Sequence, residues 1–171
     1  MSPLPTAPAQ LVRARLSDWG WLEPMVQAYL QEMAAFDPHL ASDGAGRFED
    51  VLDVEGAIHQ HGREVWLIET DVRVGWLLLD ADLRVNEGPG TSLEAIYLAP
   101  TYRRRGIGRA LWDALRQLRG GRWEFATHWG NRQGLAFVRA ARPHFPDAAY
   151  VEQPVIVDGC PMRVHRLDFP C

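Results

Sequence analysis

One stretch of this chain, residues 93–111, limits the folds available to it more than any other. Its sequence, LEAIYLAPTYRRRGIGRAL, runs from an apolar segment through a basic turn with two glycines into an amphipathic segment. The first N–H groups of a helix have no intrahelical partner, and the helix dipole favours negative charge there. Because glycine has no Cβ, Gly106 and Gly108 let a phosphate approach the main chain closely. The stretch predicts a strand, a turn and a helix, with a phosphate-bearing ligand at the start of the helix.

The basic residues of this turn narrow the class of ligand. Arginine adds charge and paired N–H donors, and four arginines surround the turn: Arg103, Arg104, Arg105 and Arg109. A P-loop requires Gly-Lys-Ser/Thr, but the chain contains no lysine, and all 18 of its basic residues are arginine. The dinucleotide fingerprint requires Gly-x-Gly-x-x-Gly, which this turn also lacks. A phosphate ligand of another class is expected.

The spacing Arg103-x-x-Gly106-x-Gly108, after a strand that ends at residues 96–100, resembles the acyl-CoA loop of the GNAT superfamily of N-acetyltransferases. A second segment agrees with this resemblance. Residues 122–128 read as a strand, and Asn131-x-x-Gly134-x-x-Phe137 opens a helix after it, similar to the family pattern whose Asn contacts the pantetheine arm. The arrangement also resembles a less-characterised subset of predicted bacterial acetyltransferases.

The resemblance implies an α/β fold of the α+β type. In it, a mixed, mostly antiparallel sheet of about seven strands is flanked by about four helices. The sequence pattern alone indicates only a mixed α/β protein. We expect residues 1–9 to form a flexible leader and 10–171 a single domain.

Acetyl-CoA is implied as co-substrate, lying between two strands and bonded by the backbone at Ile96 and Leu98. The residues expected at the cofactor are Ile96, Leu98, Arg103, Arg104, Arg105, Gly106, Ile107, Gly108, Arg109, Asn131 and Phe137.

Hydrophobic periodicity and turn residues give the expected elements. Helices are expected from Ser17 or Asp18, as the cap, to about residue 35, over about 47–60, over about 104–118, and from Asn131. Strands are expected at 10–16, 64–69, 72–80, 92–98, 122–128, 148–157 and 162–169, with a mobile loop at 82–90.

Glu94 is the candidate catalytic base. An attacking amine has a lysine-like pKa of about 10.4 and must first lose a proton. Several family members carry an acidic residue, acting through water, two positions before the residue that matches Ile96. Strand alternation predicts that Glu94, Ile96 and Leu98 share one face. The alternative is an ordinary salt bridge near the cleft.

The family's usual proton donor to the CoA thiolate, a tyrosine seven residues after Asn131, is replaced by Val138. Water, Tyr97 or Tyr150 could take that role. Otherwise the domain binds acyl-CoA without efficient turnover. Asn131 also suits a helix N-cap. Gly134 costs about 1 kcal/mol relative to alanine inside a helix, which close packing or sequence drift could explain.

The acceptor site is the least defined part of the sequence. By resemblance, the first two helices and the loops over the cleft form it, and their acidic and aromatic residues would suit a cationic amine. The alternative is the ordinary acidic outer face of amphipathic helices. These residues are Glu23, Glu32, Asp37, Asp43, Glu49, Asp50, Trp19, Trp21, Tyr29 and Phe36. His59 and His61 read as surface residues.

Composition excludes several classes of function. A net charge of −4 argues against a general nucleic-acid binder, and no apolar run approaches the 18 residues of a membrane span. The start of the chain lacks a signal pattern, so we expect a cytoplasmic protein. The placement of Cys160 and Cys171 predicts neither a disulfide framework nor a metal site.

The resemblance implies an N-acetyltransferase that transfers acetyl from acetyl-CoA to a primary amine of a small molecule or peptide. It would act by direct attack in a ternary complex, as monomer or homodimer. The alternatives are a non-enzymatic acyl-CoA-binding or sensing module, and an arginine turn that binds RNA or phosphate without CoA.

Overall fold

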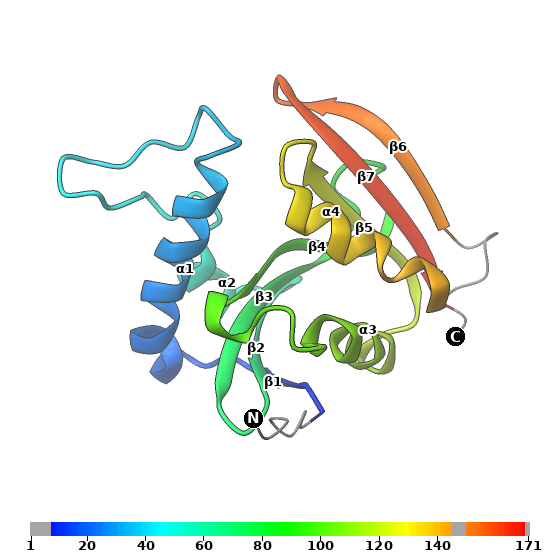
Figure 1. Cartoon of the computed structure of the whole chain (residues 1–171), viewed down its shortest axis with the longest axis horizontal. Coiled ribbons are helices and arrows are strands. Elements are labelled where there is room, and N and C mark those ends of the chain that lie inside the picture. The colour runs from blue at the N-terminus through cyan, green and yellow to red at the C-terminus, as the bar shows by residue number, and fades with distance from the viewer. Residues whose placement is uncertain (1–7, 145–149, 170–171) are drawn as a thin grey trace.

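The computed structural model describes residues 8–144 and 150–169, and its frame is a twisted seven-stranded sheet (Figure 1). The strand order is β1-β2-β3-β4-β5-β7-β6, and only β4 and β5 pair in parallel. The strands are β1 (Gln10–Arg13), β2 (Arg63–Glu69), β3 (Arg73–Asp82), β4 (Pro89–Leu98), β5 (Gly121–His128), β6 (Tyr150–Val157) and β7 (Cys160–Phe169). The predicted mixed, mostly antiparallel sheet is confirmed.

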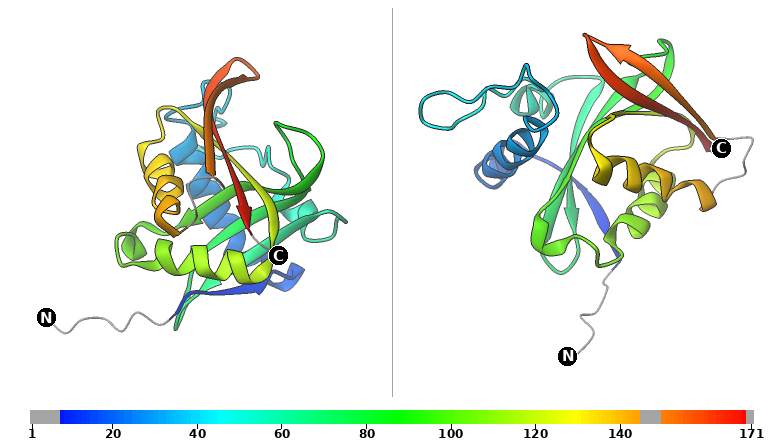
Figure 2. Two further views of the ribbon diagram at one scale, coloured as in Figure 1. Left: turned by 90° about the vertical axis from the view of Figure 1, so that its right-hand side faces the viewer. Right: turned by 45° about the horizontal axis from the view of Figure 1, so that its top comes forward.

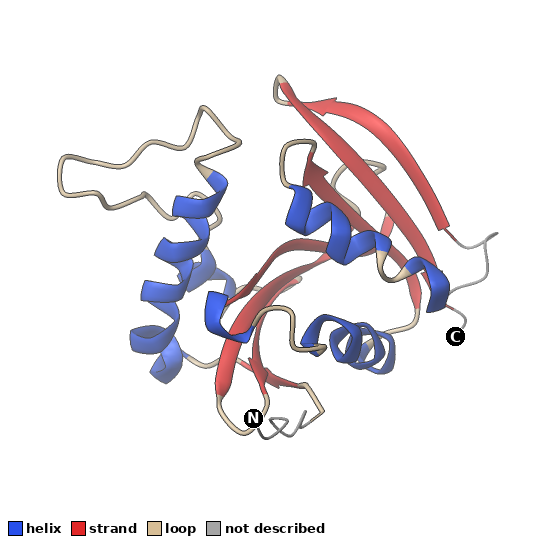
Figure 3. Ribbon diagram, in the orientation of Figure 1, coloured by secondary structure: helices blue, strands red, loops and turns tan. Residues whose placement is uncertain are grey.

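Within the described residues, four α-helices cover the two faces of this sheet (Figure 3). They are α1 (Trp19–Met33), α2 (Val54–Ala57), α3 (Ile107–Leu118) and α4 (Arg132–Arg139). Helices α1 and α2 pack on one face through a core that includes Leu22, Val54 and Trp76. Helices α3 and α4 pack on the opposite face through a core that includes Leu111 and Val138. Figure 2 shows the sheet between these two layers from two further directions.

The prediction of a helix over about 47–60 is wrong for most of that range, because only Val54–Ala57 is helical. The side chain of Gln27 holds the segment before α2 extended. Its Nε2 donates to the carbonyl of Phe48 and its Oε1 accepts from the N–H of Phe48, each at 2.8 Å. Asp50 then accepts from Val54 N at 2.7 Å, and Asp53 adopts φ 49°. Aspartates that bond nearby backbone groups compete with a helix.

Smaller differences concern element ends. Asp18 makes no side-chain cap bond to α1; its carboxylate accepts from Arg15 N at 2.8 Å and closes a 3₁₀ turn at Leu16–Asp18. Of the expected leader, residues 1–7 lie outside the described residues, whereas Ala9 is buried. The start of the strand expected at 148–157 also lies outside them. In the described part of the chain, no helix has the length and apolar character needed to cross a membrane.

The loop at residues 83–88, which was expected to be mobile, is hydrogen-bonded to a buried carboxylate. Glu124 on β5 is only 2% exposed. It accepts from Arg84 N at 3.0 Å, Val85 N at 2.7 Å and Asn86 N at 3.1 Å, and also from the side-chain amide of Asn86. The buried carboxylate thereby has partners for both oxygens, and the loop is held beside the closed end of the β4–β5 pair.

Candidate cofactor and acceptor site

Strands β4 and β5 separate part of the way along their length. Their parallel pairing covers only Thr91–Leu93 on β4 and Trp123–Phe125 on β5, although the strands continue to Leu98 and His128. The backbone of residues 94–98 therefore has no partner strand on the β5 side. Because main-chain polar groups require partners, such an opening accepts an extended ligand as an added strand. Ile96 and Leu98 both lie on the β4 edge of this opening.

The arginine turn leads from the open end of β4 to the start of α3. Gly106, with φ 82°, is the N-cap of α3 and forms no side-chain cap bond. A Cβ at Gly106 would meet nothing within 4 Å, so the positive φ, and not crowding, favours glycine here. Arg104, Arg105 and Arg109 are exposed around this helix start. An uncapped helix N-terminus beside exposed arginines suits a pyrophosphate, and the site therefore fits the phosphate end of CoA.

Helix α4 closes over the first turn of α3 through Phe137. The Phe137 ring stacks on Trp112, with ring centroids 4.7 Å apart. A Cβ at Gly108 would lie 3.3 Å from the Phe137 ring. Ile107 is 8% exposed and belongs to the core beneath. Gly108 and Phe137 thus bring the start of α3 against the last turn of α4.

Asn131 serves as the N-cap of α4, as one of the two interpretations predicted. Its Oδ1 accepts from Gly134 N at 2.9 Å. A Cβ on Gly134 would lie 2.7 Å from Asn131 Nδ2 and 3.0 Å from Thr127 Cγ2. Close packing against the cap and β5, and not sequence drift, accounts for this glycine.

Arg103 directs its side chain away from the helix start and across the opening. Its Nε donates to the carbonyl of Leu98 at 2.7 Å, and its Nη2 donates to both carboxylate oxygens of Glu32 at 2.8 and 3.0 Å. Its Nη1 donates to Gln133 Oε1 at 3.1 Å. Arg103 therefore joins the end of β4 to α1 and α4, whereas the sequence pattern groups it with the other arginines at the phosphate.

A pocket of about 450 Å³ lies beside Arg103 between the end of α1 and the start of α4. Of the acidic and aromatic residues expected at the acceptor, Glu32 and Phe36 line it. The wall comprises Glu32, Met33, Ala35, Phe36, Arg103, Gly130, Asn131, Arg132 and Gln133. The pocket therefore lies between the expected cofactor elements and the helix expected to bind the acceptor.

Other residues expected at the acceptor have structural partners. Glu23 pairs with Arg47, Asp43 accepts from the backbone of Ala45 and Arg47 at 2.8 and 2.9 Å, and Asp50 holds Val54 as described above. Tyr29 is packed edge-on against Trp76, with centroids 5.4 Å apart, and burial raises its pKa to about 12. His59 and His61 are exposed, as expected.

Glu94 occupies a β-bulge. Leu78 on β3 pairs with Ala95 and the adjacent Leu79 pairs with Leu93, so Glu94 is the extra residue on β4. Ile96 and Leu98 pack with the α3/α4 core. Glu94 instead contacts Arg63, which also bonds Leu52 on the α1/α2 side. The expectation that Glu94 shares a face with Ile96 and Leu98 is therefore wrong, because a bulge breaks strand alternation.

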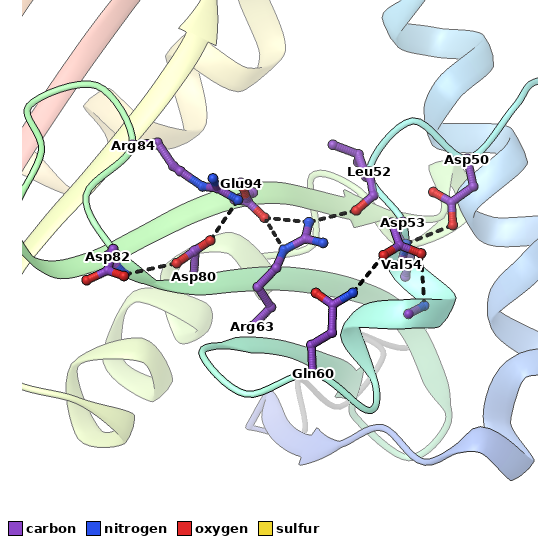
Figure 4. A network of polar contacts seen from close by, with 11 residues as sticks. Asp50, Leu52, Asp53, Val54, Gln60, Arg63, Asp80, Asp82, Arg84 and Glu94 are labelled. Atoms are coloured by element: carbon purple, nitrogen blue, oxygen red, sulfur yellow. Dashed lines mark hydrogen bonds and ion pairs between the residues drawn. The ribbon is translucent and has the colours of Figure 1, made fainter.

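Two arginines hold the Glu94 carboxylate (Figure 4). Oε2 accepts from Arg63 Nε at 3.2 Å and from its Nη2 at 2.8 Å, while Oε1 accepts from Arg84 Nε at 3.0 Å. Arg84 also pairs with Asp80 at 2.8 Å. Because each carboxylate oxygen offers about two lone-pair sites, Oε1 retains one for a water molecule.

The residues considered as thiolate donors lie in different places. Val138 is buried in the α3/α4 core. Tyr97 lies on the open half of β4, where burial and then the charge of Glu32 raise its pKa. Tyr150 pairs with Leu167, the residue that also pairs with Trp123, at the closed end of the opening. Burial, with the nearby Glu152, raises the Tyr150 pKa to about 12. Tyr97 is therefore better placed than Tyr150 to donate a proton to the CoA thiolate.

A sheet that opens between two parallel strands beside an uncapped, arginine-rich helix start defines the class of acyl-CoA-dependent acyltransferases. The family model described as "Acetyltransferase (GNAT) family" matches residues 21–139, well over half of the chain. The chain belongs to this family and is an acyltransferase.

Solved structures share the fold over nearly the whole chain. An acetyltransferase from Thermus thermophilus has a TM-score of 0.68 at 16% identity, covering 99% of this chain and 100% of that one. Spermidine N-acetyltransferase from Vibrio cholerae, in complex with CoA and spermine, has a TM-score of 0.63 at 13% identity, covering 95% and 96%. A putative acetyltransferase from Salmonella typhimurium, solved with acetyl-CoA, has a TM-score of 0.57 at 17% identity, covering 95% of each chain. Comparison with curated protein sequences finds no match.

Proposed function

We propose that this protein transfers an acetyl group from acetyl-CoA to a primary amine by direct attack in a ternary complex. The observation that carries the proposal is the opening between β4 and β5, which begins after Leu93 and Phe125 and leads directly to the uncapped start of α3. Structures with the same fold contain CoA or acetyl-CoA, and one contains spermine. The acyl donor supplies an activated thioester, and the chain must bind it, orient the amine and remove a proton.

The residues divide between these tasks. The N–H groups at the start of α3, with Arg104, Arg105 and Arg109, would hold the pyrophosphate. The backbone at Ile96 and Leu98 would bond the pantetheine arm, and a backbone donor near the thioester oxygen would stabilise the negative charge that develops there. For the pantetheine arm to bond the carbonyl of Leu98, Arg103 Nε would have to release the hydrogen bond that it now donates to that carbonyl.

Glu94 remains the proposed base, and its bulge position supports that role. On the α1/α2 side it faces the layer from which the acceptor is expected, while Ile96 and Leu98 face the other core. Oε1, with one arginine bond, can accept from a water that takes the amine proton. Arg63 and Arg84 would then act as positioning residues, since they fix the carboxylate without touching the amine.

Calorimetric titration of acetyl-CoA and CoA into the protein tests donor binding. Gly108→Glu should abolish micromolar binding, because it places a carboxylate at the helix start and crowds Phe137. Gly44→Glu is the matched control, because a Cβ at Gly44 meets nothing within 4 Å. Far-UV circular dichroism would verify that both variants fold. Absence of binding to the folded wild type, or equal binding by both variants, would contradict the proposal.

Thiol release in the presence of polyamines, amino acids and peptides then tests transfer. Because the chain has no lysine, acetyl-lysine detected in the assay cannot come from its own side chains. The alternative function, a non-enzymatic acyl-CoA-binding module, is favoured by Val138, which is buried and carries no proton donor. Tight donor binding without thiol release for any amine would support that alternative.

A further inference from the structure

Three side chains from two distant segments meet outside the site described above. Asp37 and His39 lie in the turn after α1, and Cys160 is the first residue of β7. Ligand atoms of the three residues all lie within 4.8 Å of one another, and Cys160 Sγ lies 4.0 Å from Asp37 Oδ1. No sequence pattern indicates this cluster, since more than a hundred residues separate its two segments.

The spacing is close to what a tetrahedral zinc ion requires. Zinc–ligand distances of about 2.0–2.3 Å place neighbouring ligand atoms about 3.3–3.6 Å apart. Ligand atoms at the 4.8 Å limit would have to approach one another by about 1.2–1.5 Å. His39 is exposed and can rotate toward the other two residues, whereas Asp37 and Cys160 are half-buried and already in contact. Asp37 Oδ1 also accepts from His39 N at 2.9 Å, which fixes the carboxylate within the turn.

The chemistry of the three groups selects the metal. A thiolate, an imidazole and a carboxylate together match Zn²⁺, whereas Mg²⁺ and Ca²⁺ prefer oxygen ligands alone. Among the described residues no arginine pairs with Asp37, although Glu23 and Glu32 each pair with one arginine and Glu94 pairs with two. The Asp37 carboxylate is therefore available to a cation.

We propose that Asp37, His39 and Cys160 form a zinc site that joins the turn after α1 to the β6–β7 hairpin. Both segments reach the same end of the molecule in Figure 1. Phe36, next to Asp37, lines the 450 Å³ pocket. Pro161, next to Cys160, accepts from Trp129 N at 3.0 Å, beside Gly130 in the pocket wall. A bound zinc would hold these two sides of the pocket at a fixed separation, with a fourth coordination position open to water or another ligand.

Zinc titration by calorimetry tests the site without depending on any acetyltransferase activity. The background is Cys171→Ser, which leaves Cys160 as the sole thiol. We expect saturable binding of about one Zn²⁺ per chain. Cys160→Ser and His39→Ala should each weaken binding at least about tenfold, whereas His59→Ala, an exposed histidine outside the cluster, should leave it unchanged. Circular dichroism checks that each variant folds.

Cobalt provides a second readout, because Co²⁺ bound to a thiolate absorbs in the near-ultraviolet and tetrahedral Co²⁺ absorbs strongly in the visible. Both bands should appear with the background protein and the thiolate band should be lost in Cys160→Ser. Absence of saturable zinc binding, or equal zinc affinity in Cys160→Ser, would overturn the proposal.

Discussion

At the scale of single residues, the bulge at Glu94 decides which side of the sheet carries the carboxylate. If Glu94 is the base, Glu94→Gln should lower kcat at least about tenfold, since general bases contribute roughly 10²–10⁴-fold. The KM for acetyl-CoA should change little, because Glu94 lies opposite the face of Ile96 and Leu98. Steady-state kinetics with the best amine acceptor provides the measurement. Asp82→Asn, the same change at a nearby exposed carboxylate, should leave kcat unaffected. An unchanged kcat in Glu94→Gln would remove this residue from the mechanism.

Arg103 provides a second prediction at this scale. Its pair with Glu32 is partly exposed, with 23% and 38% of the two side chains accessible, so its coupling energy should be modest. A double-mutant cycle of Arg103→Gln and Glu32→Gln, measured by urea unfolding, should give a coupling of about 1 kcal/mol. The Arg122–Asp168 pair, at 3.6 Å and with both side chains more than half exposed, should give a value near zero. Additive effects of Arg103→Gln and Glu32→Gln would show that the contact does not stabilise the fold.

At the scale of elements, the start of α4 depends on close packing more than on helix propensity. Gly134→Ala should gain up to about 1 kcal/mol of propensity but displace Asn131, whose cap is worth a similar amount, and crowd Thr127. We expect a net loss of about 1 kcal/mol in the free energy of unfolding. Gly20→Ala in α1 is the matched control, because a Cβ there meets nothing within 4 Å; it should be neutral or stabilising by about 0.5 kcal/mol. Urea unfolding of both variants distinguishes the cases. Stabilisation by Gly134→Ala would contradict the packing argument.

Local patterns were sufficient for the elements around the motif. The sequence could predict three of these elements, because their strand alternation and turn glycines depend only on residues nearby in the sequence. They are the strand at 92–98, the turn with Gly106 and the helix ending at Leu118. The bulge at Glu94 could not, since it is defined by the pairing of Leu78 and Leu79 on another strand. The prediction of a helix over residues 47–53 was wrong for the same reason. The side chain of Gln27, which lies twenty-one residues before Phe48, bonds both backbone groups of Phe48.

At the scale of the whole molecule, stability should depend on pH through His165. This residue is fully buried, its Nδ1 lies 2.7 Å from the Tyr150 hydroxyl, and burial lowers its pKa to about 4. The unfolded chain binds a proton there below about pH 6.5, whereas the folded chain does not until about pH 4. The contribution of His165 is therefore present above pH 6.5 and is lost as the pH falls to 4.

Urea unfolding at pH 7.0 and pH 4.5 measures this effect. The wild type should lose of the order of 2 kcal/mol more than His165→Gln over this interval. His59→Gln should behave like the wild type, since His59 is exposed in the fold. Equal losses in the wild type and His165→Gln would show that His165 titrates normally in the folded protein.

The pairing between β4 and β5 is also the shortest junction between strands within the sheet. Three residue pairs, Thr91–Trp123 to Leu93–Phe125, form the entire strand-to-strand seam between a four-stranded half and a three-stranded half. Hydrogen exchange should report this division, because backbone amides that face an opening are protected less than those within a continuous ladder. A ligand that fills the opening would act as an eighth strand and protect amides on both halves at once. A bound donor would then couple the two halves of the sheet more tightly than the three-pair seam and the shared α3/α4 core do alone.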